Sequence, residues 1–315
     1  MRFLLQARTW CKRSHARLST RSGAIFSVRS MESSDIPQVH GLLAEQGWVM
    51  EKAYFDCAFK TDPRGFVVAE TPSRKLIGCH GFLAHDPSMA SMGLWIVDRE
   101  SQSERVGHQM FGDLAQRFSA GTNIGTFIWP HNVDRIKDHY GISVLKSYMT
   151  WYNYGRIDPD TLKPCTDERF KILPASDVDM ADILSYDAEI HQIPREAYIQ
   201  NWIHHEQSKT YVAMRNNKVC GYGVLRSQDS FNQIAPLYAD NKHIAKAIIR
   251  HLAKHVPGQT VGFSSPLQNS SAIDFAEANN MMKYGRPLLM IFYKNKIDID
   301  TDRVYAVSSN SFGNC

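Results

Sequence analysis

The sequence predicts a mixed α/β protein made of two tandem copies of one fold, and three observations favour this fold class. The 315 residues suffice for two domains of about 150 residues each. The expected order of strands and helices in the first half of the chain recurs in the second half. A local motif also recurs, because the strands expected at Thr126–Trp129 and Val261–Phe263 are each followed by a proline and then by an asparagine that opens the next helix.

The first copy is expected to span residues 25–155. A short strand at Ile25–Arg29 opens it, and Ser33–Asp35 can cap a helix whose apolar residues recur at helical spacing from Ile36 to Leu43. The alternation of the elements that follow suggests helices layered on a mixed sheet. A helix, three strands, a helix, a strand, a helix and a final strand pair are expected at Glu51–Phe59, Phe66–Ala69, Leu76–Leu83, Met89–Val97, His108–Phe118, Thr126–Trp129, Val133–His139 and Val144–Tyr154.

The second copy is expected to span residues 170–315. It is separated from the first copy by residues 156–169, whose two prolines and several charges are typical of a linker. The same order of elements then repeats, which is why a duplication is predicted. The strands and helices are expected at Phe170–Leu173, Asp177–Leu184, Arg195–Ile203, Tyr211–Met214, Val219–Leu225, Gln233–Ala239, Lys242–His255, Val261–Phe263, Ala272–Ala278 and Leu288–Tyr293.

The amino-terminal segment has the composition of a mitochondrial transit peptide. Before Glu32 the chain has seven basic residues and no acidic one, with serines and apolar residues between the arginines. We therefore expect residues 1–24 to direct the protein to the mitochondrial matrix. A basic extension without a targeting role is the alternative, and initiation at Met31 would give a cytoplasmic form.

The rest of the chain argues against several kinds of partner. Its 29 remaining basic residues face 32 acidic ones, a balance that does not favour nucleic acid. No segment approaches the roughly 18 uncharged apolar residues of a membrane span, so no membrane partner is expected. The six scattered cysteines indicate free thiols in a reducing compartment, and His251 and His255 lack a third ligand, so no metal is expected.

A candidate anion-binding loop lies between the strand expected at Met89–Val97 and the helix expected at His108–Phe118. It reads Gln102-Ser103-Glu104-Arg105-Val106-Gly107 and leads into His108. Consecutive N–H groups at a helix N-terminus form a cradle for a pyrophosphate, which the helix dipole also attracts. Gly107 would allow the backbone to approach the phosphates closely, and Arg105 would add a cation.

This loop resembles motif A of the GNAT family of acetyltransferases, which reads Gln or Arg, two residues, Gly, one residue, then Gly or Ala. Gln102 and Gly107 match the motif, and Arg105 replaces its first glycine. The strand end Pro236–Asp240 and the tail Arg303–Gly313 are similar to a GNAT subgroup with two tandem domains. The resemblance covers roughly residues 26–313 and implies two GNAT-like domains, each a mixed, mostly antiparallel sheet flanked by helices.

The resemblance also implies a reaction and a set of binding residues. The cosubstrate would be acetyl-CoA and the acceptor a primary amine of a small molecule or an amino acid. The backbone of Ile96 and Val97 would pair with the pantetheine arm, the loop Gln102–His108 would bind the pyrophosphate, and Asn132 would belong to the same coenzyme site. A longer-chain acyl-CoA N-acyltransferase and a non-catalytic acyl-CoA-binding module are the alternatives.

The resemblance implies a general acid near the end of the helix that follows Asn132. GNAT enzymes often place a tyrosine about seven residues after such an asparagine, which indicates Tyr140 or His139. Side chains of a helix end without a catalytic role are the alternative interpretation. The conceivable bases are His80, His85, Glu70 and Asp98, among which the sequence does not select.

The second copy has no counterpart of this loop. Its fourth strand passes through Asp240–His243 directly into a helix, with no glycine at the turn. The turn is too short to present the backbone donors that a pyrophosphate needs. We predict that this degenerate copy does not hold coenzyme and that it shapes the acceptor pocket or stabilises the first copy.

Overall fold

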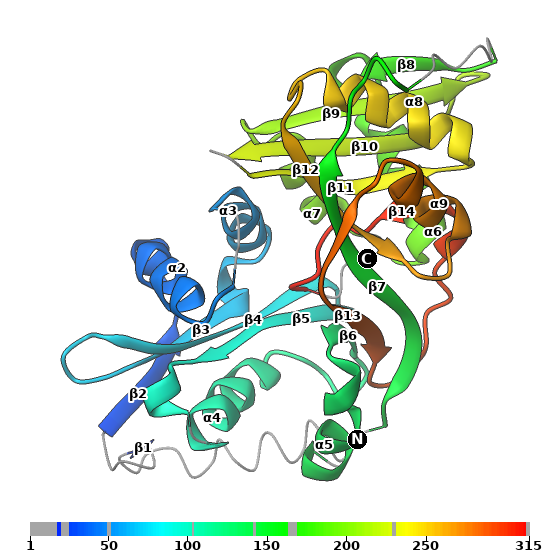
Figure 1. The fold of residues 1–315 in the computed structure, drawn as a ribbon. Helices are drawn as coiled ribbons and strands as arrows, with labels where there is room; N and C mark the ends of the chain where they lie inside the picture. Colours follow the sequence, from blue (N-terminus) through cyan, green and yellow to red (C-terminus); the bar gives the residue numbers. More distant parts are fainter. Residues whose placement is uncertain are drawn as a thin grey trace.

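A computed structural model describes residues 18–19, 25–48, 52–102, 104–140, 143–162, 169–228 and 231–312 of the chain. Within these residues the strands form one mixed sheet with helices on both faces, which confirms the predicted fold class (Figure 1). The strand order is β1-β2-β3-β4-β5-β6-β13-β7-β12-β11-β10-β9-β8, and β14 pairs with β11 outside this path. The order of the first half is therefore mirrored in the second half around the central strands β13 and β7.

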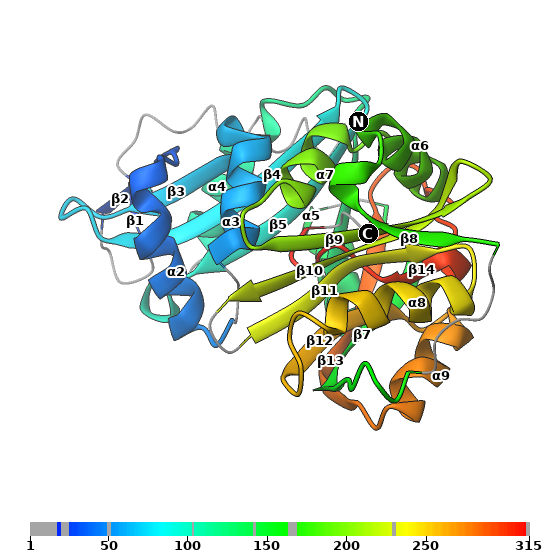
Figure 2. The ribbon, with the colours of Figure 1, turned by 90° about the horizontal axis from the view of Figure 1, so that it is seen from above.

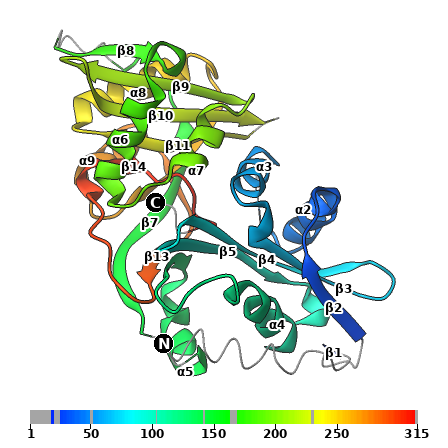
Figure 3. The same ribbon diagram turned by 180° about the vertical axis from the view of Figure 1, so that it is seen from behind.

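The helices and strands of the first copy follow the predicted order, apart from the strand pair expected at its end. Helices α2 and α3 cover one face of its sheet and α4 covers the other, while α5 packs beside β13 (Figures 1 and 3). The bounds are β1 (Leu18–Ser19), β2 (Ile25–Ser30), α2 (Ile36–Glu45), α3 (Lys52–Thr61), β3 (Phe66–Glu70), β4 (Leu76–Asp86), β5 (Met89–Val97), η3 (Arg99–Ser101), α4 (Glu104–Ala115), β6 (Asn123–Ile128), η4 (Pro130–Asn132), α5 (Val133–Tyr140) and β7 (Leu145–Arg156).

The second copy repeats this order and adds one strand at its end. Helices α6 and α7 cover one face of its sheet, and α8 and α9 cover the other (Figure 2). The bounds are β8 (Lys171–Pro174), α6 (Met180–His191), α7 (Glu196–Ile203), β9 (Ser208–Arg215), β10 (Lys218–Gln228), β11 (Phe231–Ala239), α8 (Lys242–Ala253), β12 (Thr260–Pro266), α9 (Ser270–Ala278), β13 (Met282–Phe292), η6 (Thr301–Arg303) and β14 (Val304–Ala306).

The two copies exchange their last strands. β7 leaves the first copy and pairs antiparallel with the whole length of β12, from Arg156 opposite Thr260 to Thr150 opposite Pro266. β13 returns from the second copy and pairs antiparallel with β6, with Leu289 opposite Ile128. β7 and β13 also pair with each other, so the two halves share one continuous sheet.

Two expected elements differ from the structure because of this exchange. Residues Val144–Tyr154 were expected to form a strand pair, but those from Leu145 onward belong to the single strand β7, which has a partner strand on both edges. The strand expected at Leu288–Tyr293 begins earlier, at Met282. The prediction missed its first five residues because they are exposed and give no apolar run in the sequence. Backbone pairing, and not side-chain burial, extends this strand.

One hydrophobic core continues through both copies on the face that carries α2, α3, α6 and α7. Tyr54 of α3 packs edge-on against Trp202 of α7, with ring centroids 5.3 Å apart. Both side chains are buried. The second copy is therefore packed directly against the face of the first copy that lies opposite α4.

Candidate coenzyme site

The parallel strands β5 and β6 separate after a short paired segment. Within the described residues they pair at three positions, the last of which is Ser91 opposite Gly125. Beyond it, the Thr126 hydroxyl donates a hydrogen bond to the Met92 carbonyl at 2.9 Å. β5 then continues to Val97 with β4 on its other edge. The edge of β5 from Leu94 to Val97, roughly 13 Å long, is therefore available to another extended chain.

A β-bulge bends β5 where the separation begins. Gly81 of β4 is opposite Gly93, and Cys79 is opposite Ile96, so two residues of β5 face one residue of β4. Leu94, the first of the two, has a φ of 52°, a left-handed conformation that is costly for a leucine. Bulges and strained residues are common beside active sites, where they change the direction of a strand edge.

The predicted anion-binding loop includes the first turn of α4. The helix begins at Glu104 and not at the expected His108. The prediction missed this turn because its polar residues give no helical apolar spacing in the sequence. Arg105 is exposed, Val106 is buried in the core, and His108 is half-buried. Ser103 and the side chain of Glu104 lie outside the described residues.

Ile96 and Val97, the last two residues of β5, lie close to this turn in the chain. Ile96 is buried and paired with Cys79, and Val97 is half-buried. The side-chain amide of the exposed Gln102 donates a weak hydrogen bond to the Val97 carbonyl, with the two atoms 3.5 Å apart. The structure therefore places the open strand edge and the N-terminus of α4 next to each other.

Gly107 is a glycine for a packing reason that the sequence does not reveal. A Cβ atom at this position would lie 2.9 Å from Nε1 of Trp95, the second residue of the bulge. The missing side chain therefore lets the first turn of α4 lie against the bulged part of β5. Any larger residue must displace the indole.

The second copy contains the same strand separation, but its own chain fills it. β11 and β12 pair at two described positions, the last of which is Gln233 opposite Gly262. β14 then pairs with β11, with Ala306 opposite Leu237, and the N–H of Val307 donates to the Ser264 carbonyl of β12 at 2.9 Å. The apolar run Val304–Val307 was the available signal in the sequence, although it did not reveal which strand it would join.

Comparisons with known proteins agree with this architecture. Residues 183–306 match the family model described as an acetyltransferase (GNAT) domain. A putative acetyltransferase from Pyrococcus horikoshii superposes with a TM-score of 0.72 at 15% identity, over 91% of this chain and 96% of that one. The chain has the tandem GNAT fold. The family match lies in the second copy and covers less than half of the chain, and it specifies neither an acyl group nor an amine.

Two further solved structures with the GNAT fold cover almost the whole molecule. A tandem GNAT protein from the clavulanic acid biosynthesis pathway, solved without acetyl-CoA, has a TM-score of 0.58 at 11% identity, over 87% of this chain and 100% of that one. A GCN5-related N-acetyltransferase from Sphaerobacter thermophilus has a TM-score of 0.57 at 11% identity, over 90% and 98%. No curated protein sequence matches the chain.

The residues predicted as general acids lie at the end of α5. Asn132 is half-buried in η4, and its N–H donates to the Trp129 carbonyl at 2.9 Å. The helix that follows ends with His139 and Tyr140, whose side chains lie outside the described residues, as do Gly141 and Ile142. The assignment of the acid therefore stays a prediction.

His80 of β4 lies opposite the bulge of β5 and is fully buried. Its Nδ1 lies 3.0 Å from the Gly93 carbonyl, and because a carbonyl only accepts, Nδ1 carries the proton. The ring stacks on Trp95, with centroids 4.9 Å apart. Burial lowers the pKa of His80 to about 3, so the ring is neutral at physiological pH. This histidine positions the bulge.

The other three conceivable bases differ in their surroundings. Glu70 forms ion pairs with Arg29 at 2.9 Å and Arg74 at 3.3 Å, and Asp98 pairs with Lys75 at 3.3 Å. Both carboxylates therefore already have cationic partners. His85 lies in β4, and its Nε2 is 2.8 Å from the Ser91 hydroxyl, at the last paired position before β5 and β6 separate. Its ring packs edge-on against Tyr198 of the second copy.

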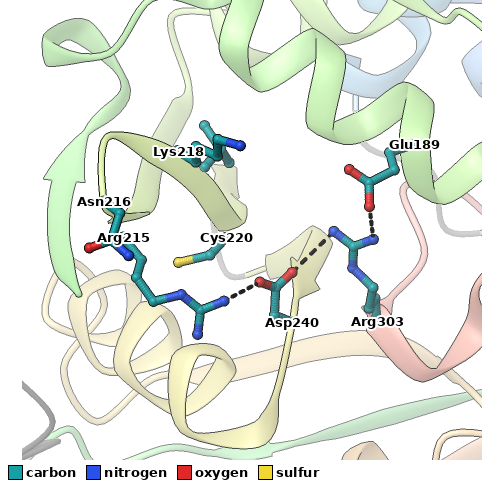
Figure 4. Close-up of a pocket in the computed structure, with 8 residues that line it drawn as sticks. Glu189, Arg215, Asn216, Lys218, Cys220, Asp240 and Arg303 are labelled. Atoms are coloured by element: carbon teal, nitrogen blue, oxygen red, sulfur yellow. Dashed lines mark hydrogen bonds and ion pairs between the residues drawn. The ribbon is translucent and has the colours of Figure 1, made fainter. Parts of the chain in front are cut away.

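A pocket of about 620 Å³ lies in the second copy, at the end of β11 (Figure 4). This position corresponds to that of the candidate loop in the first copy. Asp240 accepts from Arg215 and from Arg303, each at 3.0 Å, and Arg303 also pairs with Glu189 at 2.6 Å. The cations are thus largely neutralised. The pocket is lined by Glu189, Arg215, Asn216, Lys218, Val219, Cys220, Asp240 and Arg303.

The N-terminus of α8, which follows this pocket in the chain, is capped by its own side chain. The Asn241 side-chain oxygen accepts hydrogen bonds from the N–H groups of His243 and Ile244, at 3.0 and 3.1 Å. Two of the donors that a helix N-terminus offers to an anion are therefore already used.

The described residues contain neither a candidate metal site nor a candidate membrane span. No group of three or more His, Cys, Asp or Glu side chains in this part of the chain could hold a metal ion. Every helix in the same residues is too short or too polar to cross a bilayer.

Proposed function

We propose that the protein is an N-acetyltransferase that binds acetyl-CoA in the first GNAT copy and acetylates a primary amine of a small molecule or an amino acid. The observation that carries the proposal is the separation of β5 from β6, which leaves the edge Leu94–Val97 beside the N-terminus of α4. An extended pantetheine arm can pair with such an edge, and a pyrophosphate suits the N–H groups of a helix N-terminus and the exposed Arg105 in its first turn.

The proposed reaction is a direct transfer. The amine nitrogen attacks the thioester carbonyl carbon, a C–N bond forms, and the C–S bond breaks. The amine loses one proton, and the leaving thiolate gains one from a general acid, for which Tyr140 and His139 stay the candidates. Backbone N–H groups along the open edge of β5 would polarise the carbonyl, and positioning would supply much of the acceleration.

The binding step can be tested by titrating acetyl-CoA into the full chain in a calorimeter. Arg105→Glu places a negative charge in the first turn of α4 and should weaken binding by about 10-fold or more. Lys242→Glu is the matched control, since Lys242 is exposed in the first turn of α8 in the second copy. Equal affinities of both variants and the unmodified chain would refute the coenzyme site.

Catalysis can be separated from binding by an amine panel. Release of free CoA thiol is measured with acetyl-CoA and a series of primary amines and amino acids. Amine-dependent thiol release supports the transferase. Tight binding of acetyl-CoA without release for any amine would favour the non-catalytic acyl-CoA-binding module.

We also propose that residues 1–24 direct the protein to the mitochondrial matrix, because this segment is rich in arginine and serine and lacks acidic residues. Deletion of residues 1–30 should leave a fluorescent fusion in the cytoplasm. Import that is unchanged by the deletion would contradict the targeting role.

A further inference from the structure

The C-terminal tail, residues 304–312, connects the two GNAT copies. It begins as β14 in the strand separation of the second copy. It then runs to the first copy, where Phe312 forms an antiparallel bridge with Gly93 of β5 (red in Figures 1 and 3). One segment of about nine residues therefore starts in the filled separation and ends at the bulge beside the open one.

Hydrogen bonds from both copies hold the tail in place. The Ser309 hydroxyl accepts from the N–H groups of Ser311 at 2.9 Å and Phe312 at 3.2 Å, and it also bonds the Tyr54 hydroxyl of α3. The Asn310 side chain bonds the Ser264 hydroxyl of β12. Hydrogen bonds therefore fix the tail in position beside the proposed coenzyme site.

Phe312 lies against the sheet at the bulge, and it is fully buried. Its ring stacks on Tyr54, with centroids 6.0 Å apart, and packs edge-on against Phe66 at 5.9 Å. The two opposed glycines make room for the tail. A Cβ atom at Gly93 would overlap the Ser311 carbonyl, and one at Gly81 would lie 3.0 Å from the tip of the Phe312 ring.

The direction of the proposed coenzyme places its acyl end at this ring. The pyrophosphate would bind at the N-terminus of α4, and the pantetheine arm would run along β5 from Val97 towards Leu94. The thioester would then arrive at the bulge, one residue from Gly93, where the tail crosses. An acyl chain that extends further meets the tail backbone and Phe312.

We propose that Phe312 forms the end wall of the acyl site and restricts the donor to acetyl or a similarly short acyl group. This inference rests on the proposed coenzyme site in the first copy. It selects acetyl-CoA over the longer-chain donors that the sequence leaves open. It also gives the second copy a function in the reaction, because the wall is supplied by the end of the second copy.

The test compares acetyl-CoA, butyryl-CoA and hexanoyl-CoA on the full chain, by calorimetric affinity and by thiol release with an accepted amine. The unmodified chain should prefer acetyl-CoA. Phe312→Ala should raise the ratio of hexanoyl-CoA to acetyl-CoA affinity by about 10-fold or more, since a single methylene in an apolar pocket already changes specificity by about 10-fold. Phe312→Leu should give a smaller change in the same direction.

Phe275→Ala is the matched control for lost core volume. Phe275 is buried in α9 of the second copy, where it packs against Phe263. It should lower the melting temperature but leave the acyl-chain ratio unchanged. If Phe312→Ala does not fold, the acyl-chain ratio is measured on Phe312→Leu, because leucine retains most of the apolar volume of the side chain.

The possible outcomes separate this inference from the proposed function. A folded Phe312 variant that binds acetyl-CoA with an unchanged chain-length ratio overturns the end wall alone. Equal affinity of the unmodified chain for acetyl-CoA and hexanoyl-CoA overturns it as well. Failure of the unmodified chain to bind any acyl-CoA overturns the proposed function and this inference together.

Discussion

In the first copy β5 and β6 separate after Ser91, and the edge of β5 from Leu94 onward has no described strand partner. In the second copy β11 and β12 separate after Gln233, and β14 pairs into the space between them. The same fold thus occurs once with an open strand separation and once with a filled one. In the second copy the chain's own backbone therefore makes the hydrogen bonds that the open separation of the first copy leaves to other partners.

The interiors of the copies differ in a related way. The second copy has a buried ion pair between Arg195 and Asp187, whose nearest atoms are 2.5 Å apart, and Tyr222 also donates to Asp187 at 2.6 Å. Burial lowers the pKa of Arg195, but the charge of Asp187 outweighs it and holds the pKa well above its usual value. The first copy has an apolar stack of Trp95 and Phe111 beside its bulge. The fully buried ion pair thus lies in the second copy, and stacked rings lie beside the bulge of the first.

The largest effect that distinguishes the copies is expected from the buried ion pair. Asp187→Asn leaves the Arg195 charge buried without its partner and should lower the free energy of unfolding by about 3–5 kcal/mol, measured by urea denaturation. Glu189→Gln is the control on the same helix. Glu189 is 65% exposed where it pairs with Arg303, so its loss should cost under about 1 kcal/mol. Similar costs for both variants would contradict the difference between the interiors.

A pH effect is expected from one buried histidine in each copy. Burial lowers the pKa of His80 to about 3, and burial with the nearby Arg195 charge holds that of His191 well below its usual value. Both rings are neutral when folded but gain a proton near pH 6.5 when unfolded. Their stabilising contribution is therefore complete above pH 6.5 and decreases as the pH falls below it, by about 1.4 kcal/mol per pH unit for each ring that is still neutral in the folded protein. For His80 this decrease ends near pH 3.

The pH effect can be assigned to each copy by substitution. Urea denaturation at pH 7 and pH 5 gives the slope of the unfolding free energy. His80→Phe should reduce this slope through the first copy, and His191→Phe through the second. An unchanged slope in either variant would show that its histidine is protonated, or exposed, in the folded protein.

The smallest effects are expected at the two helix N-termini. Gly107→Ala must displace Trp95 and should weaken acetyl-CoA binding by about 10-fold, measured by calorimetry, because the indole supports the first turn of α4. Asn241→Ala removes the cap of α8 and should cost about 1 kcal/mol of stability with no change in affinity. Loss of affinity in the Asn241 variant instead would place the coenzyme in the second copy.

The order of elements in both copies could be predicted from the sequence because apolar spacing is a local signal. The apolar residues of α8, from Ile244 to Leu252, show it clearly, and these side chains are buried as expected. The exchange of β7 and β13 could not be predicted in this way. Each strand carries a pattern that fits a sheet, but no local pattern states which strand will pair with it.

The candidate site shows the same limit. The motif Gln102–Gly107 pointed to the first turn of α4, but the reason for Gly107 lies in Trp95, a residue that meets it only in the folded chain. Phe312 belongs to the tail Arg303–Gly313, which the resemblance singled out without indicating where that tail lies. Its position against Gly81 and Gly93 depends on the path of the whole tail across two copies, which is a property of the tertiary structure.

A crystal structure of the full chain with acetyl-CoA tests the central claim most directly. The account predicts one acetyl-CoA per chain, with its pantetheine arm along Leu94–Val97, its pyrophosphate at the N-terminus of α4 and its acetyl group beside Phe312. Acetyl-CoA bound between β11 and β12, with β14 displaced, would contradict the assignment of the two copies.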